Sequence, residues 1–189
     1  MFIHETADVA DGASVGHGTQ VWHQAQLMAG VRVGNGCTIG KGAFLGPGTR
    51  LGDLVKVGNY ANLFGPTVED GAFIAPLACL MEDPAPRALN PDGTRKGPDD
   101  FRRLPVTIRA GASVGGGALI LPGLTVGRSA MVSAGSVVHR DVPDHAVMAG
   151  NPARQVGFAC LCGLRLDEHL VCACSRRYVE GPAGLAPAG

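Results

Sequence analysis

A branched aliphatic residue stands at every sixth position over most of this chain. The series fills residues 9–63, shortens by one residue to continue at 68, 74 and 80, and resumes over residues 108–138 after an interruption. An α-helix repeats every 3.6 residues and a strand every 2, so neither produces this period. A short strand followed by a turn, repeated along the chain, produces a period of six residues. Three such units would close a triangular coil, and successive coils would stack through parallel strands.

A small residue follows most of these aliphatics four positions later, as Thr19, Ala25, Cys37 and Ala43 do. We therefore expect both sets of side chains to point inward and to build a narrow stacked core. Glycine often follows the aliphatic directly, and 29 of the 189 residues are glycine. We expect these glycines to let the chain bend at the corners. At three aliphatics per coil, the series predicts an all-β parallel β-helix of about six coils.

The repeat is interrupted once and ends well before the C-terminus. Residues 82–105 contain five prolines and many charges but no hexad. A loop of this length inside a compact fold usually serves function, and a plain surface excursion is the alternative. We expect a β-helix domain over residues 1–158, a cysteine-rich segment over 159–178, and a disordered Pro/Ala/Gly end over 179–189.

The charge and hydrophobic composition of the chain limits the classes of partner that we expect it to bind. Sixteen basic residues balance sixteen acidic ones, so little charge is available to neutralise phosphates, and we expect no nucleic-acid partner. No apolar run approaches the length that crosses a bilayer, and the N-terminus lacks a signal pattern, so we expect no membrane partner and a cytoplasmic location. In that compartment the six cysteines are expected to be reduced or metal-bound.

Several strings resemble a known family. The hexad V-G-x-G-small-x is similar to the repeat of left-handed β-helix acyltransferases over residues 9 to about 157. The strings "VWHQAQLMAGVRVGNGCTIG", "VEDGAFIAP" and "VGRSAMVSAGSVVHRDVPDHAVMAGNPARQVG" further resemble the nucleotide-sugar 3-N-acetyltransferases. This resemblance implies a homotrimer that binds acetyl-CoA in the cleft between neighbouring prisms. It implies acetylation of the amine of a UDP- or dTDP-linked 3-amino sugar.

The start of the loop departs from that family. Its Phe-Thr-Asn before the loop aligns with Leu80-Met81-Glu82, so a carboxylate stands where the family has an amide. A carboxylate accepts hydrogen bonds and cannot donate one as an amide does. Glu82 is therefore the candidate catalytic residue, as a base that takes the ammonium proton. The alternatives are a different acceptor or a solvated loop residue.

The resemblance also implies substrate and cofactor contacts. A guanidinium binds phosphate in bidentate fashion and an aromatic ring stacks on a base, and the implied substrate contacts are His23, Asn62, Arg87, Phe101 and Arg102. Arg95, Lys96 and Arg103 would add positive charge to the loop. The glycine-rich "VGGGA" offers backbone N–H groups to a developing oxyanion, and the implied acetyl-CoA contacts are Gly116, Ala118, Arg128, Arg140 and Arg154.

Four cysteines near the C-terminus form two C-x-C pairs, Cys160 with Cys162 and Cys172 with Cys174. Four thiolates in one place suit tetrahedral zinc. Some members of the family carry a zinc-ribbon-like extension, usually with C-x-x-C as the second pair, so this chain is one residue short there. Structural zinc, free thiols and redox pairs all stay open at this stage.

Two other functions remain as alternatives. One is a CoA-dependent acyltransferase that acts on a different small acceptor, such as a natural-product intermediate or an amino acid. The other is a non-catalytic structural β-helix, against which the long loop argues. A metal site of the carbonic-anhydrase kind is disfavoured because His17 and His23 are six residues apart and so lie on different faces of one coil.

Overall fold

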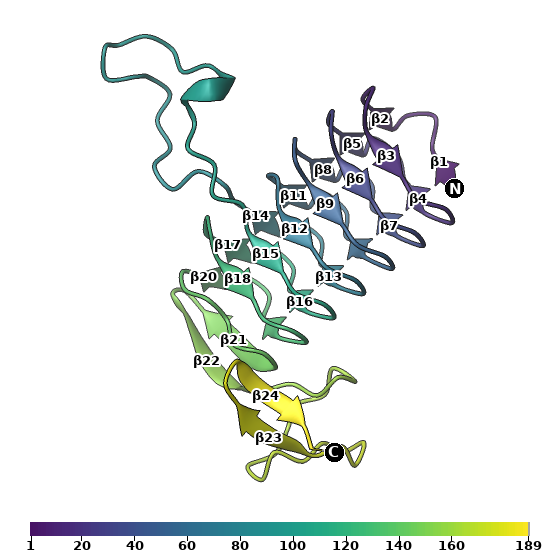
Figure 1. The fold of residues 1–189 in the computed structure, drawn as a ribbon, viewed down its shortest axis with the longest axis vertical. Helices are drawn as coiled ribbons and strands as arrows, with labels where there is room; N and C mark the ends of the chain where they lie inside the picture. Colours follow the sequence, from purple (N-terminus) through teal and green to yellow (C-terminus); the bar gives the residue numbers. More distant parts are fainter. Residues whose placement is uncertain (189) are drawn as a thin grey trace.

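The chain folds into a parallel β-solenoid, as the hexad predicts (Figure 1). The structure is a computed structural model that describes residues 1–188. Two-residue strands alternate with turns, and each strand pairs in parallel with the equivalent strand of the next coil. Every aliphatic of the series is the second residue of its strand. Within the described residues there is no α-helix, and hence no helix long and apolar enough to cross a membrane.

Three sheets form the faces of the prism. The first sheet contains β1 (Phe2–Ile3), β4 (Gln20–Val21), β7 (Thr38–Ile39), β10 (Lys56–Val57), β13 (Phe73–Ile74), β16 (Ser113–Val114), β19 (Met131–Val132), β21 (Ala146–Gly150) and β22 (Ala153–Phe158). The second contains β2 (Asp8–Val9), β5 (Gln26–Leu27), β8 (Phe44–Leu45), β11 (Asn62–Leu63), β14 (Cys79–Leu80), β17 (Leu119–Ile120) and β20 (Val137–Val138). The third contains β3 (Ser14–Val15), β6 (Arg32–Val33), β9 (Arg50–Leu51), β12 (Thr67–Val68), β15 (Thr107–Ile108) and β18 (Thr125–Val126).

The solenoid is longer than the hexad count indicates. The first sheet stacks eight parallel strands from β1 to β21 before β22 returns antiparallel, which corresponds to about eight turns rather than six. The extra strands lie at the ends. The series already begins at Ile3, and β21 joins the stack after the regular spacing has stopped.

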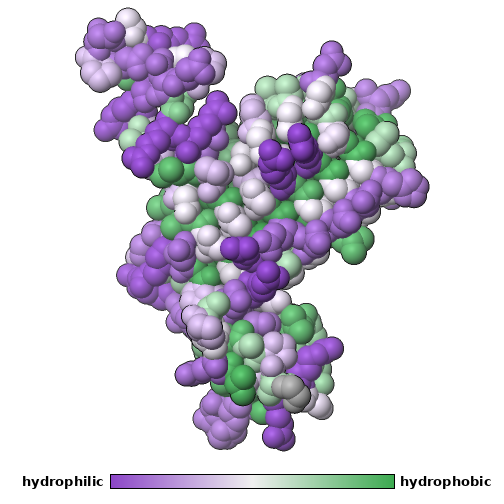
Figure 2. All heavy atoms as spheres, in the orientation of Figure 1, coloured by the Kyte–Doolittle hydropathy of each residue, from purple (hydrophilic) through white to green (hydrophobic). Residues whose placement is uncertain are grey.

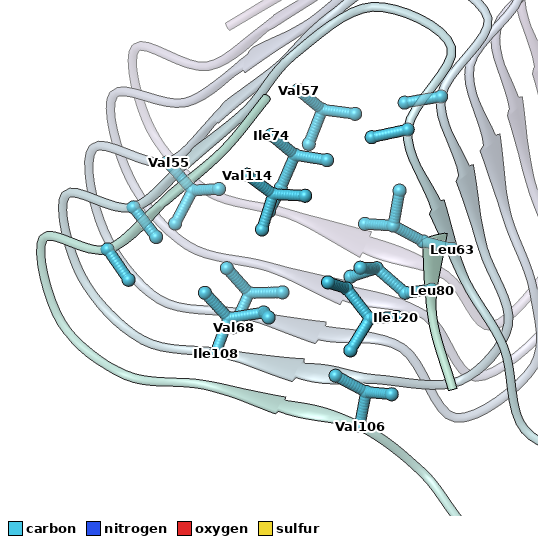
Figure 3. Close-up of a cluster of buried hydrophobic side chains, with 14 of the residues drawn as sticks. Val55, Val57, Leu63, Val68, Ile74, Leu80, Val106, Ile108, Val114 and Ile120 are labelled. Carbon is cyan, nitrogen blue, oxygen red and sulfur yellow. The ribbon is translucent and has the colours of Figure 1, made fainter. Parts of the chain in front are cut away.

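The core is a column of aliphatic side chains inside the prism (Figure 3). Ile74, Val114 and Val57 stack along one face, and Leu63, Leu80 and Ile120 stack along another. The aliphatics from residue 21 onward are buried, whereas Val9 and Val15 are half-buried at the open N-terminal end. The small residues of the hexad point inward as predicted, and Ala25, Cys37 and Ala43 are almost completely buried.

The glycines do not play the role that the sequence suggests. Gly34 and Gly52, which follow the aliphatic directly, do not have positive φ. A Cβ on Gly34 would lie 2.4 Å from the Gly52 carbonyl oxygen, so glycine is needed there because neighbouring coils approach closely. The bend lies two residues further on, where Gly36 has φ of 63° and Tyr60 has φ of 56°. The expectation that the first glycine turns the corner is therefore wrong.

Polar side chains stack along one corner as the 18-residue spacing predicts. Asn35 Oδ1 accepts a hydrogen bond from the His17 N–H at 2.9 Å, and Asp53 Oδ1 accepts from the Asn35 N–H at 2.7 Å. Asp70 continues the column by accepting from the Asp53 N–H at 2.8 Å. The turn N–H groups have no partner in a strand, so these side chains satisfy them.

Two segments leave the prism. The loop between β14 and β15 projects from the corner that joins the second and third sheets (Figure 1). Beyond β22, residues 159–188 form a small module at the C-terminal end of the solenoid. Its last part is a hairpin of β23 (Tyr178–Gly181) and β24 (Gly184–Pro187). The disordered end expected over residues 179–189 is therefore wrong for residues 179–188, and Gly189 lies outside the described residues.

Candidate functional site

A cavity of about 680 Å³ opens where the hexad stops, between the base of the loop and the loop itself. The loop contains one short 3₁₀ turn, η1 (Pro98–Asp100), and its surface is mostly hydrophilic (Figure 2). The cavity combines acidic, basic and aromatic side chains, and it is lined by Phe64, Met81, Glu82, Asp83, Pro86, Ala88, Arg95, Lys96, Gly97, Pro98, Phe101 and Arg103. A smaller cavity of about 280 Å³ adjoins it through Glu82 and Arg103.

Glu82 lies at the base of this cavity. Its side chain is 21% exposed, and its Oε1 atom lies 3.9 Å from Nε of Arg103, which is 43% exposed. The Leu104 N–H donates to the Glu82 carbonyl oxygen at 2.7 Å, which ties the two ends of the loop together. Glu82 therefore has a fixed backbone and a carboxylate with one loosely paired cation. Such a group is able to accept a proton from a bound ligand.

Asp83 is a site residue that sequence analysis missed. Its Oδ1 atom accepts from the Ala85 N–H at 2.9 Å, but its Oδ2 atom is buried and has no hydrogen-bond partner among the described residues. A buried acceptor without a partner costs free energy, so a ligand that donates a hydrogen bond would gain from meeting it. The available signal was the pair of adjacent carboxylates at the start of the interruption.

Three cations and the Phe101 ring also line the cavity. Lys96 Nζ lies 5.2 Å from the centroid of the Phe101 ring, and Arg95 and Arg103 also line the cavity. The turn that carries Phe101 is held by Asp100, whose carboxylate accepts from the Gly97 N–H at 2.8 Å. That backbone hydrogen bond, with the Asn90 amide, lowers the pKa of Asp100.

The predicted substrate residues do not all meet. Phe101 lines the cavity, whereas Arg102 and Arg87 are exposed on the loop outside it, and Arg87 donates only to the carbonyl oxygen of Pro86. Asn62 lies on β11 beside Cys79 of β14, the strand that leads into the loop, and donates to the Tyr60 carbonyl oxygen. Burial raises the pKa of the Cys79 thiol, which keeps it protonated at neutral pH.

His23 lies at a different corner, between the first and second sheets. Its ring stacks on His4 with centroids 3.5 Å apart, and it lines a cavity of about 480 Å³ with Lys41 and Asn59. His23, Lys41 and Asn59 lie in one column along this corner, because Asn59 Oδ1 accepts from the Lys41 N–H at 2.9 Å and the Gly42 N–H donates to the His23 carbonyl oxygen.

Gly116 lies on this same corner column, since the neighbouring Gly117 N–H donates to Pro76 and the Gly135 N–H donates to Gly116. Within residues 1–188 the N–H of Gly116 itself donates no hydrogen bond, and the residue is partly exposed, so this donor is available to a ligand. Ala118 is fully buried and its N–H donates to Gly115, so its side chain belongs to the core.

The three predicted CoA arginines separate into two places. Arg140 and Arg154 each approach Nε2 of His139 at 3.4 Å, on the side of the last coil where the second sheet ends. Arg128 lies elsewhere: its N–H donates to Asp144 Oδ1 at 2.7 Å, and it lines a cavity of about 690 Å³ with Arg109 and Asp141. One chain therefore does not bring all three together.

Glu69 holds Arg109 at this third corner. Its carboxylate accepts from the Arg109 guanidinium and the Ala110 N–H at 2.8 and 3.0 Å. Desolvation disfavours the charged carboxylate, but these hydrogen bonds outweigh it and lower the pKa of Glu69. Glu69 is thus a structural ion-pair partner at neutral pH.

The four C-terminal cysteines converge. Their sulfur atoms all lie within 4.8 Å of one another. The Sγ distances are 3.5 Å for Cys160 with Cys174, 3.5 Å for Cys162 with Cys172, and 3.6 Å for Cys162 with Cys174. No pair forms a disulfide. The sequence offered the four cysteines as candidate metal ligands, and the structure brings their sulfur atoms together.

Comparison with known proteins identifies the repeat. Residues 12–47 match the family described as bacterial transferase hexapeptide, with six repeats. Over those residues the chain carries the hexapeptide repeat of that family. A curated relative of the hexapeptide-repeat chain is the dTDP-3-amino-3,6-dideoxy-α-D-galactopyranose 3-N-acetyltransferase of Aneurinibacillus thermoaerophilus, 45% identical over 84 residues, or 43% of each chain. The matched segment thus spans less than half the length of that relative.

Solved structures show the same fold. A perosamine N-acetyltransferase mutant from Caulobacter crescentus, crystallised with CoA and GDP-perosamine, is 26% identical with a TM-score of 0.52, over 82% of this hexapeptide-repeat chain and 55% of that one. A mutant of AntD, an N-acyltransferase from Bacillus cereus, was crystallised with dTDP and coenzyme A. It has a TM-score of 0.65 at 20% identity, over 77% of this chain and 83% of that one.

Proposed function

We propose that this protein is an acetyl-CoA-dependent N-acetyltransferase that acylates the amine of a nucleotide-linked 3-amino sugar. The observation that carries the proposal is the cavity at the interruption, which combines two carboxylates, three cations and two aromatic rings. Its relatives support the reaction class, since the curated relative is a dTDP-amino-sugar 3-N-acetyltransferase and the Caulobacter structure holds CoA with an amino-sugar nucleotide.

The reaction would proceed by direct attack of a neutral amine on the thioester carbonyl. A C–N bond forms, the carbonyl oxygen becomes negative, and collapse of that intermediate breaks the C–S bond. The proton that the acylated nitrogen then loses passes to the CoA thiolate, which leaves as the thiol. The amine arrives partly as ammonium, and Glu82 or Asp83 takes its proton. Asp83 suits the binding step in particular, because an ammonium N–H would satisfy its unpaired buried oxygen.

The loop side of the cavity suits the nucleotide. Arg95, Lys96 and Arg103 would neutralise the diphosphate, since guanidinium groups bind phosphate oxygens in bidentate fashion. Phe101 would stack on the base. Phe64 and Met81 supply the apolar part of the wall.

The acyl donor would bind at the other corner, with the free Gly116 N–H donating to the carbonyl oxygen. Glu82 and Gly116 lie at different corners of one prism, so a single chain does not place them at one reaction centre. We therefore propose a homotrimer in which the loop of one subunit, which projects from its own prism, reaches the Gly116 corner of the next (Figure 1).

A thiol-release assay tests the proposal. The purified protein is incubated with acetyl-CoA and a panel of UDP- and dTDP-linked 3-amino sugars, free amino sugars, and small amines. We expect turnover on at least one nucleotide-linked amino sugar. A panel in which no nucleotide sugar is acetylated, while the protein binds CoA in a calorimeter, would refute the assignment of the acceptor.

A second acceptor class is favoured by one observation. Glu82 stands where the resembling family has an asparagine, so the protein could act on a different small acceptor, such as an amino acid or a natural-product amine. The same assay decides between the two classes, because turnover confined to amines without a nucleotide would establish this alternative.

A further inference from the structure

We propose that the C-terminal module is a zinc-dependent cap on the C-terminal end of the solenoid, with one Zn²⁺ bound by Cys160, Cys162, Cys172 and Cys174. The sulfur positions fit this ion. A tetrahedral zinc with Zn–S bonds of about 2.3 Å places its sulfurs about 3.8 Å apart. The recorded Sγ distances of 3.5 to 3.6 Å, within an outer limit of 4.8 Å, bracket this value.

The two C-x-C segments have the same backbone geometry, twelve residues apart. The Cys160 N–H donates to Leu164 and the Gly163 N–H donates to Cys160, each at 2.8 Å. In the second segment the Cys172 N–H donates to Arg176 and the Ser175 N–H donates to Cys172, again at 2.8 Å. Gly163 and Ser175 also share positive φ, of 87° and 69°. Each segment is a tight knuckle that presents two thiols to the same point.

The match between the two knuckles answers the objection that the second cysteine pair is shorter than the C-x-x-C of the resembling family. The second pair is one residue short of C-x-x-C, but the first pair is equally short, and the two knuckles match each other. The flanking bonds match as well, since Leu166 N–H donates to Phe158 and Tyr178 N–H donates to Leu170, both at 3.0 Å. Two equal knuckles facing one another supply four ligands symmetrically.

The module has too little apolar core to stand without such a link. Its buried side chains are Ala159, Cys160, Cys172, Tyr178 and Leu185, so two of the five are the thiols themselves. Apart from one hairpin, its pairing consists of isolated bridges. Segments shorter than about 40 residues usually need disulfides or a metal to fold. The described cysteines form no disulfide, which leaves the metal.

Neighbouring groups suit a bound tetrathiolate. A zinc with four thiolates carries net negative charge, and two donors already point at the sulfurs. The Tyr178 hydroxyl donates to Cys160 Sγ at 3.1 Å, and the Arg176 guanidinium donates to Cys174 Sγ at 3.3 Å. Outer hydrogen bonds of this kind orient metal ligands and stabilise their charge.

The same tyrosine connects the metal site to the solenoid. Its ring packs edge-on against His145, with centroids 4.9 Å apart. His145 Nδ1 and the Ala159 carbonyl oxygen lie 2.8 Å apart, and the His145 N–H donates to the Arg128 carbonyl oxygen. The hairpin adds a second anchor, where the Asp144 N–H donates to Ala183 at 2.9 Å. Zinc would therefore fasten the module against the last coil.

Elemental analysis of the full-length protein, desalted after expression with zinc, is the direct test. We expect about one zinc per chain, and we expect the Cys160→Ser, Cys172→Ser double variant to lose it. Cys37→Ser is the matched control, because that thiol is buried in the prism and should leave the zinc content unchanged. Stoichiometric iron in place of zinc, or a mass showing two disulfides, would overturn the proposal.

A second measurement keeps the proposal testable if the double variant folds poorly. Wild-type protein stripped of zinc and titrated with Co²⁺ should develop the visible absorption of tetrahedral cobalt thiolate with an endpoint near one ion per chain. Stripping should also make residues 159–188 sensitive to protease while the prism stays resistant. A stripped protein with no cobalt spectrum and an unchanged cleavage pattern would show that the four cysteines are free thiols.

Discussion

Replacing Gly34 by alanine should destabilise the prism far more than replacing Gly30. A Cβ on Gly34 would lie 2.4 Å from the Gly52 carbonyl oxygen and 2.5 Å from its carbon, so it meets backbone that has no room to move. The Gly34 N–H is also hydrogen-bonded to Leu51 of that coil at 2.9 Å. Overpacking costs about 1–3 kcal/mol, and weakening that bond adds about 1 kcal/mol, so we expect a loss of about 3 kcal/mol.

Gly30 is the matched control. It has φ of 78°, but a Cβ there would meet nothing within 4 Å. The left-handed conformation costs alanine about 1–2 kcal/mol, and reduced freedom of the unfolded chain returns about 0.4–1 kcal/mol, so a net loss of about 1 kcal/mol is expected.

Thermal unfolding followed by circular dichroism measures both variants against the wild type. For a chain of this size 1 kcal/mol corresponds to about 2–4 °C in Tm, so we expect a fall of about 6–12 °C for Gly34→Ala and about 2–4 °C for Gly30→Ala. Equal falls, or a larger one for Gly30→Ala, would refute the assignment of the first glycine to close approach of the coils and restore a role in turning the corner.

Three further predictions follow from the site and the core. Glu82→Gln should lower kcat by about 10²-fold or more if its carboxylate accepts the amine proton; unchanged kcat with intact CoA binding would leave that role to Asp83. Asp100→Asn should speed tryptic cleavage of the loop relative to Asp99→Asn, because only Asp100 holds the Gly97 N–H. Hydrogen bonding lowers the pKa of Asp100 from its ordinary value, so that protection should be constant above about pH 5 and lost as pH falls through the folded-state pKa. Protection that falls between about pH 8 and 5 would contradict this. Ile74→Ala should cost about 2–5 kcal/mol of unfolding free energy, because the side chain is fully buried, whereas Phe73→Ala on the outer surface should cost much less by the same denaturation.

Much of the fold was predictable because the repeat is local. A hexad fixes which residue of each short strand points inward, and the 18-residue spacing fixes which residues stack. The column of His17, Asn35 and Asp53 was predictable for that reason. The end strands were missed, since β21 and β22 leave the period. The loop bounds were predictable, because the hexad stops at Leu80 and resumes at Ile108.

The candidate site was predictable only in part. Glu82 and Phe101 share a cavity because the loop folds back on its own base, which no local pattern encodes. Asp83 was missed because an unpaired oxygen is a property of its surroundings rather than of its residue type. Arg102 and Arg87 are exposed and do not line the cavity although the string resembles a substrate loop, since the place of a side chain depends on how the whole loop folds.

The sequence by itself determined the solenoid and the place of its interruption, because periodic burial acts between neighbours along the chain. Tertiary structure decided the rest. Contact between coils explains why glycine follows aliphatics such as Val33 and Leu51, and the position of corners separates Glu82 from Gly116. The fold of the two knuckles places the Sγ atoms of Cys160 and Cys174 3.5 Å apart. These features depend on residues far apart in the chain, and only the folded backbone brings them together.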